Sequence, residues 1–583
     1  MMRLVTVLVP FVTALWLSPA SVVGKKCGDV CFDFSDEEPC VENCQKKQRC
    51  ECCFEWNPRQ ESLSTLKWWE NTDALEGDSS RLEWFRNRQV YEPIVDSKEK
   101  NLIAGVLYTH SQTTLKMTVL FPPLYPEEAR QAAVFVIGTS TGKLWEQTCN
   151  INDGTWHCTV RFDSIPHTES YFYEVQYTAD SNHYSSDYFY NYGGSIPMQK
   201  DYPRIAGVGC FGKDSTKNKD ELRDAIIAQD PDILVLQGDQ TYFHTNLLYG
   251  FLETIYAINE LTRNIPTIVQ LDDHDYGQGN IWGAWDEDED SGAGFDVAPC
   301  VVNAVQDLSI GHLPDPGSDQ TLDNGIKSYY TNYIYGKTDL AIMESRKFKN
   351  RRNGDSLFGS NQEAWVQEWC EDQERLKVIL LQTPISILAT NSTRNGEITS
   401  MRAVIQDVTT PGRDRFMGII KDCTQLLLSG DQHLGIAVTY DQYGMSECAS
   451  PAASNDIFWR LNSFEEGKSH MSGDGMQYTL HKVWNVKRNT YLKYRNAPNT
   501  RLVDNDVMKK NRADGFLMVN LDGTTATRKT KALRYAAKVL VQAHQLARTP
   551  AHSTHLKDFS ALTQIALDMT NEVRSSFAWN RPL

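Results

Sequence analysis

Potential metal ligands follow five short apolar segments of the chain, at the point where each segment ends. The segments RIAGVG, DILVLQG, TIVQLDD, KVILLQT and QLLLSGD have the length and composition of buried strands. In open α/β sheets, sites lie beyond the carboxyl ends of the strands, so these five ends can converge on one point. The polar residues at the ends are Cys210; Asp239 and Tyr242; Asp272, Asp273, His274 and Asp275; Gln382; and Asp431 and His433.

Each of these residues alone has a plainer explanation. A cysteine such as Cys210 in a secreted protein is more often half of a disulfide than a ligand. A Gly-Asp pair usually marks a turn, and Gln382 could simply bond to backbone. The joint occurrence of these residues at successive strand ends favours a metal site, because independent turns have no reason to share that order.

The donor types indicate which ions such a site would hold. Cys210, Tyr242 and the carboxylates of Asp239, Asp273 and Asp431 could together carry five negative charges. A phenolate is a hard donor that favours a trivalent ion, and carboxylates favour Ca, Mg or Mn over Zn. Ferric iron with calcium would balance this charge, whereas two zinc ions would leave the site more anionic.

The strands alternate with helical stretches, which predicts an α/β domain with a buried sheet over residues 203–530. Residues 101–202 instead contain β-branched and aromatic runs separated by turn signals, as in a small all-β sandwich. Within it, Cys149 and Cys158 flank a turn and suit a hairpin closed by a disulfide. Residues 531–583 are predicted to form a helical extension.

The N-terminus is typical of export. A positive residue, an apolar stretch and small residues predict a signal peptide over residues 1–24. Residues 25–60 hold seven of the 14 cysteines, which favours a disulfide-rich module in an oxidising compartment. Residues 61–100 are polar and rich in Trp, and we assign them no structure. Asn391 begins a glycosylation sequon in a polar stretch.

The formal net charge is −17, so the chain as a whole repels nucleic acid and anionic membranes. An anionic substrate would therefore need locally concentrated positive charge. The basic run SRKFKNRRNG offers Arg346, and TPGRDR offers Arg413, as candidate phosphate contacts. Basic runs are more often solvated surface, and we favour that interpretation for the rest of the first run.

The order G-C, G-D-x-x-Y, D-D-H-D and G-D-x-H resembles the alkaline phosphatase D (PhoD-like) metallophosphatases, a branch of the calcineurin-like and purple acid phosphatase superfamily. The resemblance covers residues 203–530 and, more loosely, the preceding β region. It implies a four-layer αββα core, a two-metal centre of Fe(III) and Ca(II), with Mn, Mg or Zn as alternatives, and phosphate-ester hydrolysis. A metal-bound hydroxide would attack phosphorus in line.

The same resemblance implies a role for each site residue. Asp239 matches the aspartate that bridges both metals, and His274 matches the histidine that acts on the leaving group or transition state. The residues that match ligands of the first metal are Cys210, Tyr242 and His433; those that match ligands of the second are Asp273 and Asp431. Gln382 stands where many members have His, which leaves its ligand role open.

The sequence thus predicts a secreted phosphomonoesterase or phosphodiesterase, with a phosphate ester as substrate and no stable nucleic-acid partner. Its main alternative is a secreted acidic binding or matrix protein that retains the fold and the metals. A secreted nuclease is a third possibility, and it would need a basic channel that the composition does not indicate.

Overall fold

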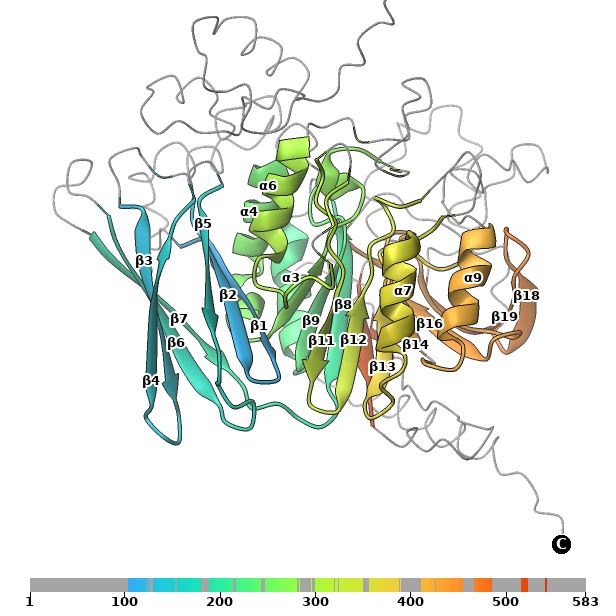
Figure 1. Cartoon of the computed structure of the whole chain (residues 1–583), viewed down its shortest axis with the longest axis horizontal. Helices are drawn as coiled ribbons and strands as arrows, with labels where there is room; N and C mark the ends of the chain where they lie inside the picture. Colours follow the sequence, from blue (N-terminus) through green and yellow to red (C-terminus); the bar gives the residue numbers. More distant parts are fainter. Residues whose placement is uncertain are drawn as a thin grey trace, which may run out of the picture.

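A computed structural model of the chain describes residues 103–542 with internal gaps, the longest of which are 284–294, 389–409, 455–465, 485–514 and 523–539 (Figure 1). The predicted signal peptide, Cys-rich module and residues 61–100 lie outside the described residues, as does Asn391. The same holds for most of the predicted C-terminal extension. None of the helices within the described ranges is both long and apolar enough to cross a membrane.

The first part of the described chain is a pair of antiparallel sheets, at the left of Figure 1. One has the strand order β1-β2-β5 and the other the order β4-β3-β6-β7, and their inner residues share a single apolar cluster. Cys149 and Cys158 are joined by a disulfide. The strands are β1 (Gly105–Ser111), β2 (Thr114–Leu120), β3 (Gln131–Gly138), β4 (Leu144–Asn150), β5 (His157–Phe162), β6 (Tyr171–Ala179) and β7 (Tyr188–Ile196).

The second part contains two larger sheets. In the first, the parallel strands β8, β9 and β10 are neighbours, and β17, β20 and β21 extend it. All five residues of β9 are buried, as expected for a strand covered on both faces. The strands of this sheet are β8 (Arg204–Phe211), β9 (Ile233–Gln237), β10 (Thr267–Gln270), β17 (Ala452–Ser454), β20 (Phe516–Asn520) and β21 (Leu540–Gln542).

The second large sheet has the order β11-β12-β13-β14-β16-β15-β19-β18. Successive residues of its central strands enter different cores: Leu340 and Val378 join the apolar cluster of the first sheet, whereas Ala341 and Ile379 join a cluster with α7 and α9. The strands are β11 (Thr331–Tyr335), β12 (Thr338–Ile342), β13 (Leu376–Leu380), β14 (Leu426–Ser429), β15 (Gly435–Tyr440), β16 (Met445–Ala449), β18 (Lys468–Met471) and β19 (Gln477–Trp484).

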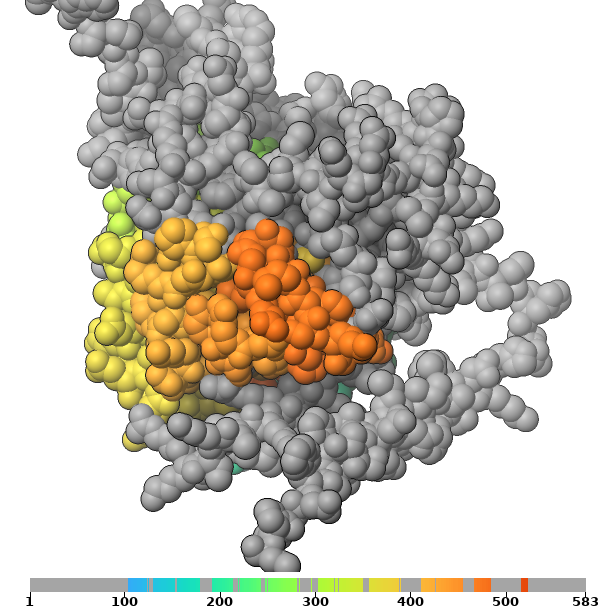
Figure 2. Space-filling model, turned by 90° about the vertical axis from the view of Figure 1, so that its right-hand side faces the viewer, coloured from blue at the N-terminus to red at the C-terminus, as the bar shows by residue number. Residues whose placement is uncertain are grey.

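Helices cover the outer faces of these sheets. Apolar residues of α3 and α4 pack on the first sheet, and those of α7 and α9 on the second. Figure 2 shows the surface that α9 and the hairpin β18–β19 form at the far end of the second sheet. The helices are α3 (Thr216–Ile227), α4 (Leu247–Ala257), α5 (Asn259–Thr262), α6 (Pro299–Ile310), α7 (Ser360–Trp369) and α9 (Thr410–Ile420), with the 3-10 turn η8 (His274–Tyr276).

Two features differ from the sequence-based expectation. Residues 531–583 were predicted to be helical, but Leu540–Gln542 form the strand β21, which pairs antiparallel with β20. This segment contains β-branched valine, which suits a strand that completes the edge of a sheet. A second disulfide, between Cys370 and Cys423, ties the ends of α7 and α9 together, and the sequence had not indicated this pair.

The segment GHLPDP, which begins at Gly311, makes polar contacts with both parts of the chain. The hydroxyl of Thr109 on β1 donates to the carbonyl of His312. Asp315 pairs with Lys116 on β2 at 3.3 Å and with Arg161 on β5 at 2.5 Å. The imidazole of His312, itself completely buried, bonds to the carbonyl of Thr267 where β10 begins. This segment therefore connects the β region to a strand that leads to the site described next.

Candidate metal centre

The ends of four strands from both large sheets meet at one place. Cys210 lies at the end of β8, Asp239 follows β9, Asp273 follows β10, and Asp431 and His433 follow β14. Six residues predicted as ligands therefore come together from segments more than 200 positions apart, since Tyr242 also points into this group.

The carboxylate of Asp239 lies at the centre of the first set of donors. Its Oδ2 accepts from the hydroxyl of Tyr242 at 2.8 Å and from the thiol of Cys210 at 3.7 Å. The Tyr242 hydroxyl also lies 2.9 Å from Nε2 of His433. Cys210, Asp239 and His433 each offer one ligand atom, and these atoms all lie within 4.8 Å of one another. One cation could contact all of them.

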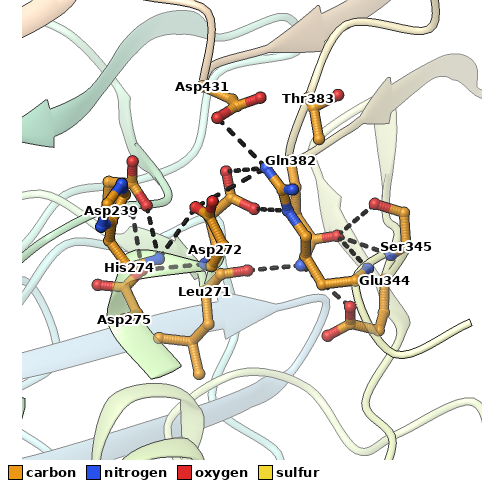
Figure 3. Close-up of polar contacts among 12 residues, drawn as sticks. Asp239, Leu271, Asp272, His274, Asp275, Glu344, Ser345, Gln382, Thr383 and Asp431 are labelled. Atoms are coloured by element: carbon orange, nitrogen blue, oxygen red, sulfur yellow. Dashed lines mark hydrogen bonds and ion pairs between the residues drawn. The ribbon is translucent and has the colours of Figure 1, made fainter. Parts of the chain in front are cut away.

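A second set of donors shares Asp239. One oxygen each from Asp239, Asp272, Asp273 and Asp431 lie within 4.8 Å of one another. The backbone N–H of His274 donates to Asp239 at 3.2 Å and to Asp273 at 2.9 Å, which fixes two of these carboxylates on the η8 turn (Figure 3). The set consists of hard oxygen donors, as calcium, magnesium or manganese sites require.

The backbone at this place adopts a conformation that L-residues rarely use. Cys210, Asp239, Asp431 and His433 have φ of 58°, 55°, 61° and 47°. They are four of the eight non-glycine residues with positive φ in the described chain. Such conformations are costly and persist where the surrounding structure enforces them, often at functional sites.

The glycines before the ligands allow the strands to approach closely. A Cβ on Gly238 would lie 2.4 Å from Cβ of Asp272, and Gly238 has a φ of 86°. A Cβ on Gly430 would lie 2.5 Å from the carbonyl oxygen of Gln237. The Gly-Asp pairs in the sequence are therefore needed here for packing, and they carry the following aspartates into the site.

The electrostatics of the cluster favour a bound cation. Burial, and then the neighbouring Asp273 and Asp272, raise the pKa of Asp239 well above its usual value. Burial, followed by the charges of Asp239 and Asp431, likewise raises the pKa of the Cys210 thiol. Because like charges are packed together in a buried place, a metal ion would relieve a repulsion that the chain's own side chains leave in place.

Comparison with known families and structures adds an independent finding. Residues 248–510 match the family model described as PhoD-like phosphatase. This part of the chain is similar to PhoD-like phosphatases, and we call it the PhoD-like domain. No curated protein matches the chain. The match to the family model includes Asp273, Asp431 and His433 but begins after Cys210, Asp239 and Tyr242. Geometry alone therefore joins the last three residues to the site of the PhoD-like domain.

Solved structures show distant likeness. A purple acid phosphatase, PPD1, from yellow lupin (Lupinus luteus) is 12% identical with a TM-score of 0.44, and the alignment covers 73% of this chain and 71% of the lupin chain. A β-glucuronidase of Parabacteroides merdae is 10% identical with a TM-score of 0.22, over 56% of this chain and 35% of the other. These scores are too low to carry an argument about the PhoD-like domain.

Two acidic residues of the D-D-H-D motif support the site of the PhoD-like domain rather than joining the predicted ligand set. The carboxylate of Asp275 accepts from the backbone N–H groups of Asp239, Gln240 and Asp272 at 2.8, 2.8 and 3.0 Å. Asp275 thus fixes the turn that carries Asp239. Asp272 forms an ion pair with Arg346. The strand-end position of both aspartates was visible in the sequence, but their separate roles depend on contacts between segments.

Gln382 has both ends of its amide engaged in the PhoD-like domain. Its Oε1 accepts from the backbone N–H and the hydroxyl of Ser345 at 2.6 and 2.8 Å, and its Nε2 donates to the carbonyl of Leu271 and to Glu344 (Figure 3). It therefore braces the loop after β12. A ligand role for Gln382 stays a prediction without support from these contacts.

The two arginines predicted to bind phosphate are both buried in ion pairs. The Arg346 side chain is completely buried among Asp272, Asp273 and Asp431. Arg413 on α9 pairs with Asp474 and Asp414. Of the rest of the basic run, Lys347 and Lys349 are buried as well, and Arg351 and Arg352 lie outside the described residues. The expectation of a solvated basic face is therefore wrong for the two lysines, because the turn after β12 folds them inward.

Proposed function

We propose that this chain is a secreted metal-dependent phosphoesterase that hydrolyses phosphate mono- or diesters at a two-metal centre. The observation that carries the proposal is the convergence of Cys210, Asp239, Tyr242, Asp431 and His433, together with Asp273, at the edge of a PhoD-like phosphatase domain. The four-layer αββα core is part of the proposal. It is supported by the apolar cluster shared between the two large sheets and by the cluster under α7 and α9.

The donor chemistry fits two different ions. Cys210, Tyr242 and His433 would hold the first ion, and the hard phenolate of Tyr242 favours Fe(III). Asp273 and Asp431 would hold the second, with oxygen donors suited to Ca(II), or to Mn(II) or Mg(II). Asp239 lies in both donor sets and would bridge the two ions. When bound, the metal pair would activate water and neutralise charge on the phosphoryl group.

His274 is the residue of this chain that we assign to proton transfer. Its backbone is fixed by Asp239 and Asp273, and its ring lies against the Tyr242 ring with the centroids 4.1 Å apart. The imidazole is half-buried and therefore within reach of a bound ester. It would donate a proton to the leaving oxygen or hydrogen-bond to the phosphoryl group as charge develops there.

Secretion is supported by the covalent structure of the chain. Disulfides join Cys149 to Cys158 and Cys370 to Cys423, and such bonds persist in oxidising compartments. The predicted signal peptide over residues 1–24 agrees with that location.

The test uses the full chain expressed through a secretory pathway. Elemental mass spectrometry would give the metal content, and chromogenic phosphate mono- and diesters would report turnover. We expect bound iron with a divalent ion, and hydrolysis that Asp239→Asn abolishes while Asp441→Asn, at a carboxylate bonded to Ser469 and Thr479, does not. Metal-free protein that stays inactive after reconstitution with iron, calcium and manganese would overturn the proposal and favour the binding-protein alternative.

A further inference from the structure

A positive side chain lies inside the group of carboxylates that would hold the second ion. The guanidinium of Arg346 is completely buried and bonds to both oxygens of Asp272. Its NH2 group also lies 3.2 Å from Asp431 and 3.8 Å from Asp273. One guanidinium therefore contacts three of the four clustered aspartates.

The fold holds Arg346 in this position. It lies in the turn directly after β12, where Gln382 accepts from the backbone N–H of Ser345 at 2.6 Å and from that of Arg346 at 3.3 Å. The same amide donates to the carbonyl of Leu271, the residue before Asp272 (Figure 3). The segments carrying the arginine and its aspartate partner are thus tied together by Gln382, which explains why this amide has no donor or acceptor to spare for a metal.

The pairing changes the charge available to a metal. The carboxylates of Asp239, Asp272, Asp273 and Asp431 bring four negative charges, and Arg346 cancels one. Since three of the four carboxylates are buried and Asp431 is 14% exposed, each unit of charge strongly affects the affinity for an ion. A trivalent ion gains more than a divalent ion from every extra negative charge, so the arginine penalises the trivalent ion more.

We propose that Arg346, paired with Asp272, is a specificity-determining residue that makes the second position of the metal centre select a divalent over a trivalent cation. The inference rests on the proposed metal centre and assigns a task to two residues outside its ligand set. It replaces the predicted phosphate contact of Arg346, whose guanidinium is enclosed by carboxylates and shielded from solvent.

The experiment measures the ratio of terbium(III) to calcium(II) affinity on the full chain by competition, after dialysis against a chelator. The first position is filled beforehand with gallium(III), so that terbium emission sensitised by Tyr242, which lies beside the cluster, reports occupancy of the second position. Arg346→Gln should raise the ratio by about tenfold or more, because one positive charge is lost within a few ångströms of the ion. Asp272→Asn should lower it by a similar factor, since Arg346 then acts uncompensated.

Two further variants separate charge from shape. The double variant Asp272→Asn with Arg346→Gln restores the charge balance and should return the ratio to within about threefold of wild type. Arg346→Lys keeps the charge and should do the same. Lys377→Gln, at the buried pair of Lys377 with Asp339, is the matched control for general destabilisation and should leave the ratio unchanged.

The possible failures are distinct. Wild type could bind both ions while neither Arg346→Gln nor Asp272→Asn changes the ratio of terbium(III) to calcium(II) affinity. In that case the selectivity role is wrong, and the proposed metal centre is unaffected. The near-isosteric Asp272→Asn keeps the test decisive if Arg346→Gln does not fold. If wild type binds neither ion, the proposed metal centre itself is wrong and this inference falls with it.

Discussion

The carboxylates around Asp239 and those of Glu447 and Asp474 are largely buried, but the two groups differ in the donors that surround them. Asp474, between β18 and β19, accepts from Ser386 at 2.6 Å and pairs with Arg413. Glu447 on β16 accepts from Ser429, Tyr440 and the backbone N–H of Ile385. We call these two carboxylates with their partners the Glu447 network. Every carboxylate in it has neutral or positive donors.

Around Asp239 the carboxylates face one another instead. Asp239, Asp272, Asp273 and Asp431 share one guanidinium, and the backbone at two of the four has positive φ. A structural network satisfies its buried charges with its own donors, whereas this cluster keeps an excess of negative charge that a bound cation would balance. The comparison gives a way to tell a buried polar support from a candidate reaction centre in the same domain.

Asp239→Asn should have the largest effect on activity. Removing the carboxylate common to both donor sets should lower kcat/KM by about a thousandfold or more, because Asp239 would contribute to holding both ions. The metal-free protein should not lose stability, since the change removes a charge that its neighbours repel. Ester hydrolysis with thermal unfolding in chelator measures both. A destabilised but fully active variant would contradict the role.

Replacing His274 should have the next largest effect. His274→Asn removes the imidazole but keeps the backbone N–H that fixes Asp239 and Asp273, so metal content should stay near wild type. We expect kcat to fall about a hundredfold to a thousandfold, as for the loss of a general acid. The reduction should be smaller for esters with good leaving groups, which need no proton. An equal loss for all leaving groups would mean that His274 orients ligands instead.

Much of this candidate site could be predicted from the sequence because the predicted ligands follow apolar strands. Cys210, Asp239, Tyr242, Asp431 and His433 could be named from strand ends alone, and the structure brings them together. That the strands belong to two sheets could not be read from spacing. Pairing partners such as β14 with β16, or β8 with β20, depend on contacts between distant segments.

The arginines show where sequence reasoning stops. A basic run in an acidic chain suggests attraction of phosphate, but whether Arg346 faces solvent depends on the turn after β12 and on Gln382 from β13. Arg413 likewise meets Asp474 from a hairpin 61 positions away. The sequence shows where a basic residue lies in the chain, but only the tertiary structure shows which acidic residue it pairs with.

In the Glu447 network, Asp474→Ala should lower the stability of the fold and leave the kcat of the folded protein unchanged. The change removes the buried partner of Arg413, whose other partner, Asp414, is about half exposed. Because a buried charge then loses its ion pair, the unfolding free energy should fall by about 3 kcal/mol or more. Denaturant unfolding measures the loss. Arg415→Ala, at a pair in which the arginine is 45% exposed, is the matched control and should cost below about 1 kcal/mol. A kcat loss larger than the loss of folded protein would place Asp474 in the reaction centre.

The smallest predicted effect concerns the pH dependence of the Glu447 network. The pKa of Glu447 is raised to about 7, mainly by burial and to a smaller extent by the nearby Asp474, while the hydrogen bonds from Ser429 and Tyr440 lower it. Below its ordinary pKa of 4.5 this carboxyl is protonated in folded and unfolded chain alike. As the pH rises from there to about 7, the unfolded chain ionises first, so this group removes up to about 3 kcal/mol of unfolding free energy.

Glu447→Gln keeps a neutral acceptor for Ser429 and removes the titration. Unfolding free energies of the variant and wild type should therefore agree near pH 4.5 and separate in favour of the variant by about 2 to 3 kcal/mol at pH 8. Denaturant unfolding across that range, on chelated protein so that metal binding does not contribute, gives the difference directly. A constant offset between the two proteins would mean that Glu447 is ionised throughout in the fold. Its hydrogen bonds, rather than its burial, would then control its charge. The Glu447 network would then tolerate a full negative charge without the cation that we propose for the Asp239 cluster.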